Sequence, residues 1–249
     1  MVTLIKHKSA QYRIDLSQPL DISIPLRAGV KGVNAYHAPP FSVEPVRMGS
    51  FVGSVAEGGP VNYLNVRINP HGNGTHTECV GHISKEPYTI NQCLKQFFFL
   101  AKVISVYPAM AENGDLVIFK DELEKILNDS VPEALVIRTL PNDALKLTAQ
   151  YSGRNPPYFH PEALDYLQKL GVEHLLTDLP SVDREEDEGK LLAHHIFWQY
   201  PQETRTNATI TELIYVPMEV TDGMYFLNLQ IASFEIDASP SKPVLYRLI

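Results

Sequence analysis

The feature that most restricts the fold of this chain is a helical segment followed closely by a short apolar segment, a pattern that occurs twice. Apolar residues recur with helical spacing over 120–127 and over 160–170. Compact apolar runs, which are typical of buried strands, follow at 134–139 and at 174–179. Helices that alternate with strands usually pack on the faces of a sheet, so the pattern predicts an α/β fold.

The remaining segments are expected to be richer in strands and loops. Alternating or β-rich apolar patterns predict one or two short strands within 12–26 and further strands at 61–68, 97–107, 209–216, 224–231 and 243–248. The stretch 29–60 holds three prolines between 39 and 45 and a Gly-Gly-Pro turn at 58–60, which favour a long ordered loop. Loops of that length commonly serve as lids or subunit contacts.

Composition limits the class of protein. The 249 residues are 44% hydrophobic and 20% charged, no linker or repeat is evident, and we expect a single domain over 1–249. A formal net charge of −8 argues against a nucleic-acid or anionic-membrane partner, because both usually select a basic face. There is no apolar run of about 18 residues, so we expect a soluble, cytoplasmic protein that acts on a small molecule.

A dense group of histidines occupies residues 71–82, which read His-Gly-Asn-Gly-Thr-His-Thr-Glu-Cys-Val-Gly-His. Three histidines and one carboxylate therefore lie close to three glycines. Imidazole and carboxylate donors together suit Zn²⁺ or Mn²⁺, and glycine lets the backbone turn tightly enough to direct several side chains at one point. The segment predicts a metal site.

An extended backbone suits this motif better than a helix does. In a helix, His76 and Glu78 would lie about 200° apart around the axis and would not share an ion. In an extended segment, His76, Glu78 and His82 project to one side, whereas Cys79 projects to the other. His71 has the opposite parity, but a bulge or a turn at the intervening glycines can bring it to the same side.

The motif resembles the signature His-x-Gly-Thr-His-x-Asp-x-Pro-x-His of the cyclase family, which includes bacterial kynurenine formamidase and isatin hydrolase. Gly74, Thr75, His76 and His82 match the signature directly. The resemblance extends along nearly the whole chain. Further similar segments are Asp15-Leu16-Ser17, Arg138-Thr139, the stretch from 160 to Asp183, and Asp237-Ala238-Ser239-Pro240.

Three positions of the motif depart from the family signature. Glu78 stands where the family has aspartate, Val80 stands where it has proline, and Gly72 occupies the register of the first histidine. The simplest repair is a one-residue insertion that lets His71 serve as the first ligand. His71, His76 and Glu78 would then surround one ion.

The resemblance implies a mixed, curved or barrel-like sheet flanked by helices, of the swivelling β/β/α type. It also implies a metal-activated water that attacks a formamide or a cyclic amide. A later histidine and glutamate complete the family site, and this chain offers His194, His195 and Glu212 as candidate catalytic residues. We favour His194 over His195 as the one that faces the metal; a histidine that is not a ligand is suited to protonate the departing amine.

Several alternatives stay open. If His82, His194 and Glu212 bind a second ion, the site resembles two-metal members of the family; if they only position water and substrate, it resembles single-metal members. Zn²⁺ and Mn²⁺ both suit the donors. The departures also agree with a metal-free small-molecule binding protein, and the enzyme could instead open a lactone or catalyse a cyclisation. Family members form dimers or tetramers, so a homo-oligomer is implied as well.

Overall fold

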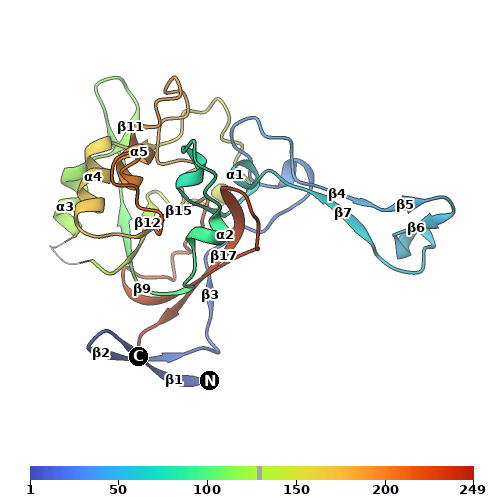
Figure 1. Cartoon of the computed structure of the whole chain (residues 1–249), viewed down its shortest axis with the longest axis horizontal. Coiled ribbons are helices and arrows are strands. Elements are labelled where there is room, and N and C mark those ends of the chain that lie inside the picture. The colour runs from blue at the N-terminus through green and yellow to red at the C-terminus, as the bar shows by residue number, and fades with distance from the viewer. Residues whose placement is uncertain (128–130) are drawn as a thin grey trace.

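The computed structural model describes residues 1–127 and 131–249, and its centre is a mixed β-sheet that curves round on itself (Figure 1). In spatial order the strands are β16 (Gly223–Ile231), β9 (Phe98–Val106), β12 (Ala134–Thr139), β14 (His174–Thr177), β15 (Thr209–Glu212), β8 (His76–Glu78), β17 (Ala238–Arg247) and β3 (Leu20–Asp21). Because β16 also pairs with β17, the sheet closes into a barrel, with β3 outside the ring. The predicted α/β fold with a barrel-like mixed sheet is confirmed.

The parallel part of the barrel contains the strands that the compact apolar runs predicted. β9, β12, β14 and β15 pair in parallel. Leu135 and Ile137 of β12 pack in the core cluster that includes the helices, whereas Ala134 and Val136 belong to a second cluster formed with the other strands. Both faces of β12 are therefore covered, which explains its continuous apolar sequence.

Three helices lie along one side of the barrel (Figure 1). They are α3 (Lys120–Ile126), α4 (Pro161–Lys169) and α5 (Leu192–Trp198). In α4, Pro161 occupies the first turn, where a missing N–H costs nothing, and Gly171 follows the helix with a φ of +86° that favours glycine. The helices predicted at 120–127 and 160–170 are confirmed, whereas α5 has no counterpart among the predicted elements.

Smaller elements complete the body. The strands are β1 (Val2–His7), β2 (Ala10–Asp15), β10 (Ala109–Met110), β11 (Leu116–Ile118) and β13 (Tyr158–Phe159). The short helices are α1 (Pro70–Asn73) and α2 (Ile90–Cys93), and 3-10 turns occur at Gly29–Lys31, Val80–His82 and Ala144–Thr148, with a further one at Val55–Glu57 outside the body. Within the described ranges, no helix combines the length and the apolar character that a bilayer span requires.

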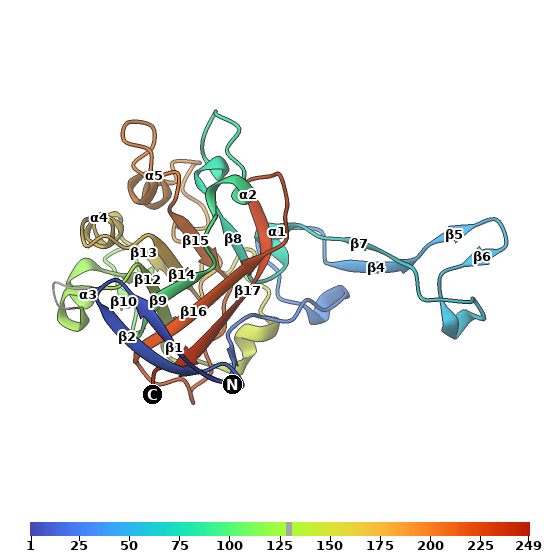
Figure 2. The ribbon, with the colours of Figure 1, turned by 60° about the horizontal axis from the view of Figure 1, so that its bottom comes forward.

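A two-stranded arm projects from the body (Figure 2). It spans residues 42–67 and consists of β4 (Ser42–Pro45) paired with β7 (Leu64–Arg67) and, nearer its tip, β5 (Arg47–Met48) paired with β6 (Phe51–Val52). The prediction of a loop over 29–60 is therefore wrong for this part. Prolines pointed to a loop, but Pro45 is compatible with a two-stranded ribbon because an edge strand does not need every N–H.

Candidate metal centre

Strand β8 places the central pair of the histidine motif on one face. His76 and Glu78 are both fully buried, and Thr77 between them bonds the Thr211 hydroxyl at 2.8 Å on the other side. β8 is held between β15 and β17, with His76 opposite Glu212 on β15. The predicted extended conformation is thus present where it matters for His76 and Glu78.

The strand does not continue to His82, as the sequence pattern suggested. It ends at Glu78, and a 3-10 turn over Val80–His82 brings His82 back, with Nδ1 3.8 Å from Oε2 of Glu78. A side chain at Gly81 would place its Cβ 2.0 Å from the Tyr88 carbonyl oxygen. Glycine therefore permits the turn, and His82 reaches Glu78 by a path other than strand alternation.

His71 lies on the one-turn helix α1, which begins at Pro70 and is capped by the side chain of Asn69. Its Nδ1 is 3.1 Å from Oε2 of Glu78. A Cβ at Gly72 would lie 2.4 Å from the Ala38 Cβ and 2.9 Å from the Ala35 carbonyl oxygen. No histidine fits at position 72 in this backbone, and His71 is the residue that faces Glu78.

The opposite wall comes from α5 and from the end of β15. His194 Nε2 lies 3.1 Å from Oε1 of Glu78, and His76 Nε2 lies 3.4 Å from Oε2 of Glu212. His195, although adjacent in sequence, turns away: its Nδ1 faces the Tyr200 carbonyl at 3.1 Å, and it lines a different hollow. His194 therefore belongs to the cluster around Glu78, and His195 lies outside it.

In the described chain, three sets of side chains each place their potential ligand atoms within 4.8 Å of one another. They are His71 with His76 and Glu78; Glu78 with His82 and His194; and His71 with His82 and Asp237. His71, Glu78 and His82 each belong to two of these groups, so the three groups form one connected cluster. Glu212 borders the cluster through its contact with His76.

Two aspartates that sequence reasoning left without a role orient the histidines. Asp183 contacts His194 Nδ1 at 2.6 Å and also accepts the backbone N–H groups of Ala193 and His194. Asp237 contacts His71 Nε2 at 2.8 Å and His82 Nδ1 at 3.3 Å. Asp183 begins an acidic run in the sequence, yet it is only 7% exposed.

Each of the three central histidines consequently has one ring nitrogen occupied and the other facing the cluster. The occupying acceptor is the Gly74 carbonyl for His76 at 2.9 Å, Asp183 for His194 and Asp237 for His71. Histidine ligands are commonly held in this way, because a bond at one nitrogen fixes the tautomer that offers the other to a metal.

The charges in the cluster compensate one another. Burial opposes ionisation of Glu78, but the charge of His82 and the neighbouring His194 and His71 outweigh it and hold the pKa of Glu78 well below its usual value. Burial also opposes charging of His71, yet Asp237 and Glu78 raise its pKa to about 10. Asp183 and Glu78 raise the pKa of His194 against the same opposing burial. The raised pKa values favour protons on the ring nitrogens of His71 and His194 that face Glu78, which are the positions that a metal cation can take instead.

The cluster fits a divalent metal. His76 Nε2 and Glu78 Oε2 are buried and have no hydrogen-bond partner among the described residues; the 3.1 Å contact of Glu78 with His71 lacks hydrogen-bond geometry. Buried polar atoms are rarely left in this state. A cation between an imidazole nitrogen and a carboxylate oxygen satisfies both, and this donor set suits Zn²⁺ or Mn²⁺.

A cavity of about 320 Å³ opens onto the cluster, with His71, His82, His194 and Glu212 in its wall. Tyr36 also lines it, and its hydroxyl donates to the Pro180 carbonyl at 3.0 Å. Burial and the nearby charge of Glu212 raise the pKa of this phenol, which stays protonated. The space suits a small molecule.

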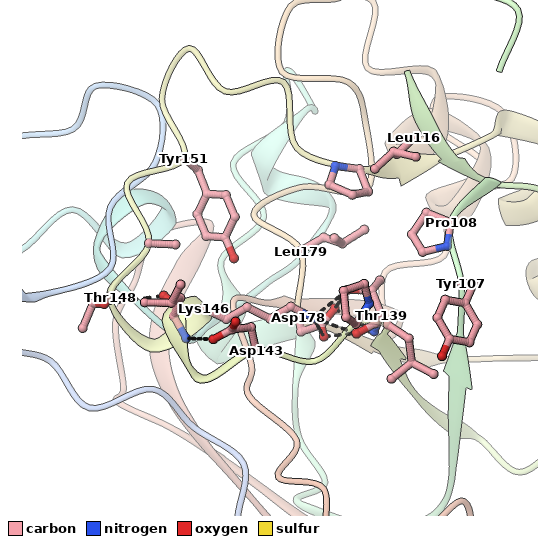
Figure 3. A pocket seen from close by; sticks show the side chains of 15 residues that line it. Tyr107, Pro108, Leu116, Thr139, Asp143, Lys146, Thr148, Tyr151, Asp178 and Leu179 are labelled. Carbon is pink, nitrogen blue, oxygen red and sulfur yellow. Dashed lines mark hydrogen bonds and ion pairs between the residues drawn. The ribbon is translucent and has the colours of Figure 1, made fainter. Parts of the chain in front are cut away.

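A larger cavity, about 560 Å³, lies at the carboxyl ends of β12 and β14. Figure 3 shows Tyr107 and Leu116 on one side of it and Tyr151 and Lys146 on the other. Its floor holds an ion pair of 2.8 Å between Lys146 and Asp178. The candidate ligands described above are not in its wall.

Fold and site together define a barrel-like α/β protein with a buried histidine–carboxylate cluster suited to a divalent metal. The Cyclase family model matches residues 14–184, more than half of the sequence. The chain belongs to the cyclase family.

Relatives and solved structures agree with this assignment. Kynurenine formamidase from Bacillus thuringiensis is 26% identical over 234 residues, which cover 93% of this chain and 96% of the relative. The kynurenine formamidase of Bacillus cytotoxicus is 28% identical over 235 residues, with the same coverage of both chains. Isatin hydrolase A from Labrenzia aggregata shares the fold with a TM-score of 0.69 at 14% identity, over 93% of this chain and 94% of that one. A structure described as a potential metal-dependent hydrolase with cyclase activity gives a TM-score of 0.66 at 16% identity, over 92% and 97%.

Proposed function

We propose that this protein is a metal-dependent hydrolase that cleaves the carbon–nitrogen bond of a small formamide or cyclic amide. The observation that carries the proposal is the pair of buried, unpartnered ligand atoms, His76 Nε2 and Glu78 Oε2, beside a cavity of small-molecule size. The names of the relatives, kynurenine formamidase and isatin hydrolase A, support this class of substrate.

One or two ions of Zn²⁺ or Mn²⁺ fit the arrangement. His71, His76 and Glu78 would hold one, and Glu78, His82 and His194 would hold a second, with Glu212 beside them. A divalent metal, when bound, supplies positive charge that polarises a carbonyl group and acidifies water.

The histidines have different parts in this proposal. His194 is 2% exposed and both of its nitrogens face carboxylates, so it would serve as a ligand in the two-ion arrangement. His82 is a half-buried residue of the cavity wall whose Nδ1 faces Asp237. In the one-ion arrangement, its Nε2 is therefore suited to deliver a proton to the departing amine.

The test is metal content and turnover of the purified protein and of His76→Ala. We expect bound zinc or manganese, hydrolysis of N-formylkynurenine or isatin, and loss of both metal and turnover in the variant. His195→Ala is the matched control and is expected to keep both, because His195 lies outside the cluster.

Full metal content and turnover in His76→Ala would contradict the proposal. A wild-type protein that stays metal-free after incubation with zinc and manganese would favour a binding protein instead. Hydrolysis of simple lactones without hydrolysis of either amide would move the reaction to ester opening.

A further inference from the structure

The two cysteines of the chain, Cys79 and Cys93, meet in the structure. Cys79 directly follows β8 and is fully buried, whereas Cys93 ends the short helix α2 and is half-buried. Cys93 packs against the core cluster that contains Cys79, and the two thiols are hydrogen-bonded to each other. Both are free thiols. The fold therefore brings together the two side chains of this chain that can form a disulfide.

Backbone hydrogen bonds hold the two cysteines in this position. The N–H of Cys79 donates to the carbonyl of Asp237 at 3.0 Å, and the N–H of Ile90, in α2, donates to the carbonyl of Ile236 at 2.8 Å. Cys79 Sγ also lies 3.8 Å from the carbonyl oxygen of Tyr88, shortly before α2. The end of β8 and the start of α2 are thus bonded to one segment, so the thiols can join without a rearrangement of the fold.

Only one of the two thiols is open to solvent. A hollow of about 250 Å³ has Cys93 and Lys95 in its wall, whereas Cys79 has no exposed surface. The hydrogen bond with Cys79 lowers the pKa of Cys93 against the opposing effect of burial, and the charge of Lys95 adds to this lowering. Cysteines that react with peroxides are accessible, readily ionised and placed beside a second cysteine. Cys93 meets these conditions, with Cys79 as the second cysteine.

We propose that Cys93 and Cys79 are a reversible modification site, which a hydroperoxide oxidises to a disulfide that weakens the candidate metal centre. The Cys93 thiolate attacks one oxygen of the peroxide and the O–O bond breaks, which leaves a sulfenic acid on Cys93. The other oxygen takes the proton that Cys93 lost and departs as an alcohol, or as water from hydrogen peroxide.

The buried thiol completes the reaction. Cys79 attacks the sulfur of the sulfenic acid, the S–S bond forms and the S–O bond breaks, and the hydroxyl departs as water with the proton of Cys79. The two thiols together lose two electrons, which reduce the peroxide. A dithiol such as dithiothreitol reverses the change by thiol–disulfide exchange.

Cys79 connects this pair to the candidate metal centre. It directly follows Glu78, and the residue that accepts its N–H is Asp237, whose carboxylate contacts His71 and His82. A disulfide holds its sulfur atoms closer together than a hydrogen bond does, so its formation draws Cys79 and α2 together. A close-packed interior transmits such a shift to adjacent residues. Glu78 and Asp237 are therefore displaced from the positions that suit a metal.

Treatment of the purified protein with a slight excess of hydrogen peroxide tests the modification site. Free thiols are counted in denaturant, and the intact mass is measured before and after treatment. We expect the count to fall from two to zero and the mass of the single chain to fall by that of two hydrogen atoms. Dithiothreitol should restore both values.

Two single variants are the controls, and circular dichroism should show an unchanged fold in each. In Cys79→Ala no second thiol is present, so Cys93 should accumulate as a sulfenic acid that dimedone traps. Cys93→Ala should keep its remaining thiol under the same treatment, because Cys79 is buried.

The zinc affinity of the oxidised and reduced protein tests the link to the metal centre, which rests on the proposed function. Competition with a chromophoric chelator measures it. We expect oxidation to weaken zinc binding about tenfold, at the low end of the effect of disturbing the groups behind metal ligands. Dithiothreitol should restore the affinity, and peroxide should leave that of Cys93→Ala unchanged.

Wild-type protein that keeps both thiols, or that gains oxygen atoms without forming the disulfide, would overturn the modification site. A disulfide that leaves zinc affinity unchanged would overturn its link to the metal centre. A protein that forms the disulfide but binds no metal in either state would contradict the proposed function and this link, while the modification site would stand. The two failures are therefore distinguishable.

Discussion

A histidine beside Glu78 is oriented to bind a metal only while its other ring nitrogen is bonded to a carbonyl or carboxylate oxygen. Asp237→Asn and Asp183→Asn preserve shape but remove the carboxylate charge that holds His71 and His194. We expect each to weaken zinc binding by about 10–100-fold, the usual effect of losing a carboxylate behind a histidine ligand. Competition with a chromophoric chelator measures the affinity.

The matched control for these variants is Glu186→Gln, which lies in the same acidic run but is exposed. It should bind zinc as the wild type does. Equal affinities for Asp237→Asn and wild type would show that Asp237 does not orient His71.

At this scale the sequence located the clustered histidines and carboxylates better than the side chains that orient them. The motif and the family resemblance pointed to the six clustered residues His71, His76, Glu78, His82, His194 and Glu212. The choice between His194 and His195 depended on how α5 faces the barrel, which no local pattern reveals. Asp237 is separated from His71 by 166 positions, so its contact could not be read from spacing.

Helix α1 and the segment that crosses it explain the altered first position of the motif. Gly72 accepts the N–H of Ala35 and leaves no space for a side chain beside Ala38. We expect Gly72→Ala to lower the free energy of unfolding by about 1–3 kcal/mol, because the segment around Ala38 must move. Urea denaturation provides the measurement.

Ala38→Gly removes the nearest clashing atom, the Ala38 Cβ. Combined with Gly72→Ala, it should partly restore stability, once the effect of Ala38→Gly alone on the free energy of unfolding has been subtracted. Gly72→Ala with wild-type stability would mean that this packing is looser than the distances indicate.

Among the elements, buried strands and helices were predicted well because the spacing of their apolar residues alone shows which face is buried. The arm was missed for the opposite reason. Its prolines and glycines indicate a loop, and its apolar residues form a pattern only when β4 is aligned with β7, about 20 positions away. Helix α5 was also missed; its first turn depends on Asp183 as an acceptor.

The whole molecule is expected to lose stability in mild acid through His174. Burial, and to a smaller extent the charge of Arg205, lower the pKa of His174 to about 4, whereas an unfolded chain has a pKa near 6.5. Between pH 6.5 and pH 4, His174 binds a proton in the unfolded chain but stays neutral in the folded protein, so the free energy of unfolding falls as pH falls.

We expect this residue to account for a loss of about 2 kcal/mol between pH 6.5 and pH 5. Urea denaturation of wild type and His174→Asn over that range measures the difference; asparagine can keep a bond to the Thr209 hydroxyl, which lies 2.8 Å from Nδ1. Parallel pH profiles for the two proteins would exclude His174 as the cause.

The closure of the barrel was not readable from periodicity, which indicated only alternating helices and strands. The ring depends on β8 meeting β17, and these strands are separated by more than half of the chain. The family resemblance supplied the barrel-like sheet, since its ordered matches span the segments that meet there.

Strand β8 has only three residues, yet it lies between β15 and β17 and carries His76 and Glu78. The same residues therefore belong both to the candidate metal site and to the closed barrel. A substitution that alters the site also disturbs the pairing of the strands. A side chain that borders the cavity without forming the ring, as Tyr36 does, is free of this double constraint. A substitution there can reshape the cavity while the short strand keeps its place in the barrel.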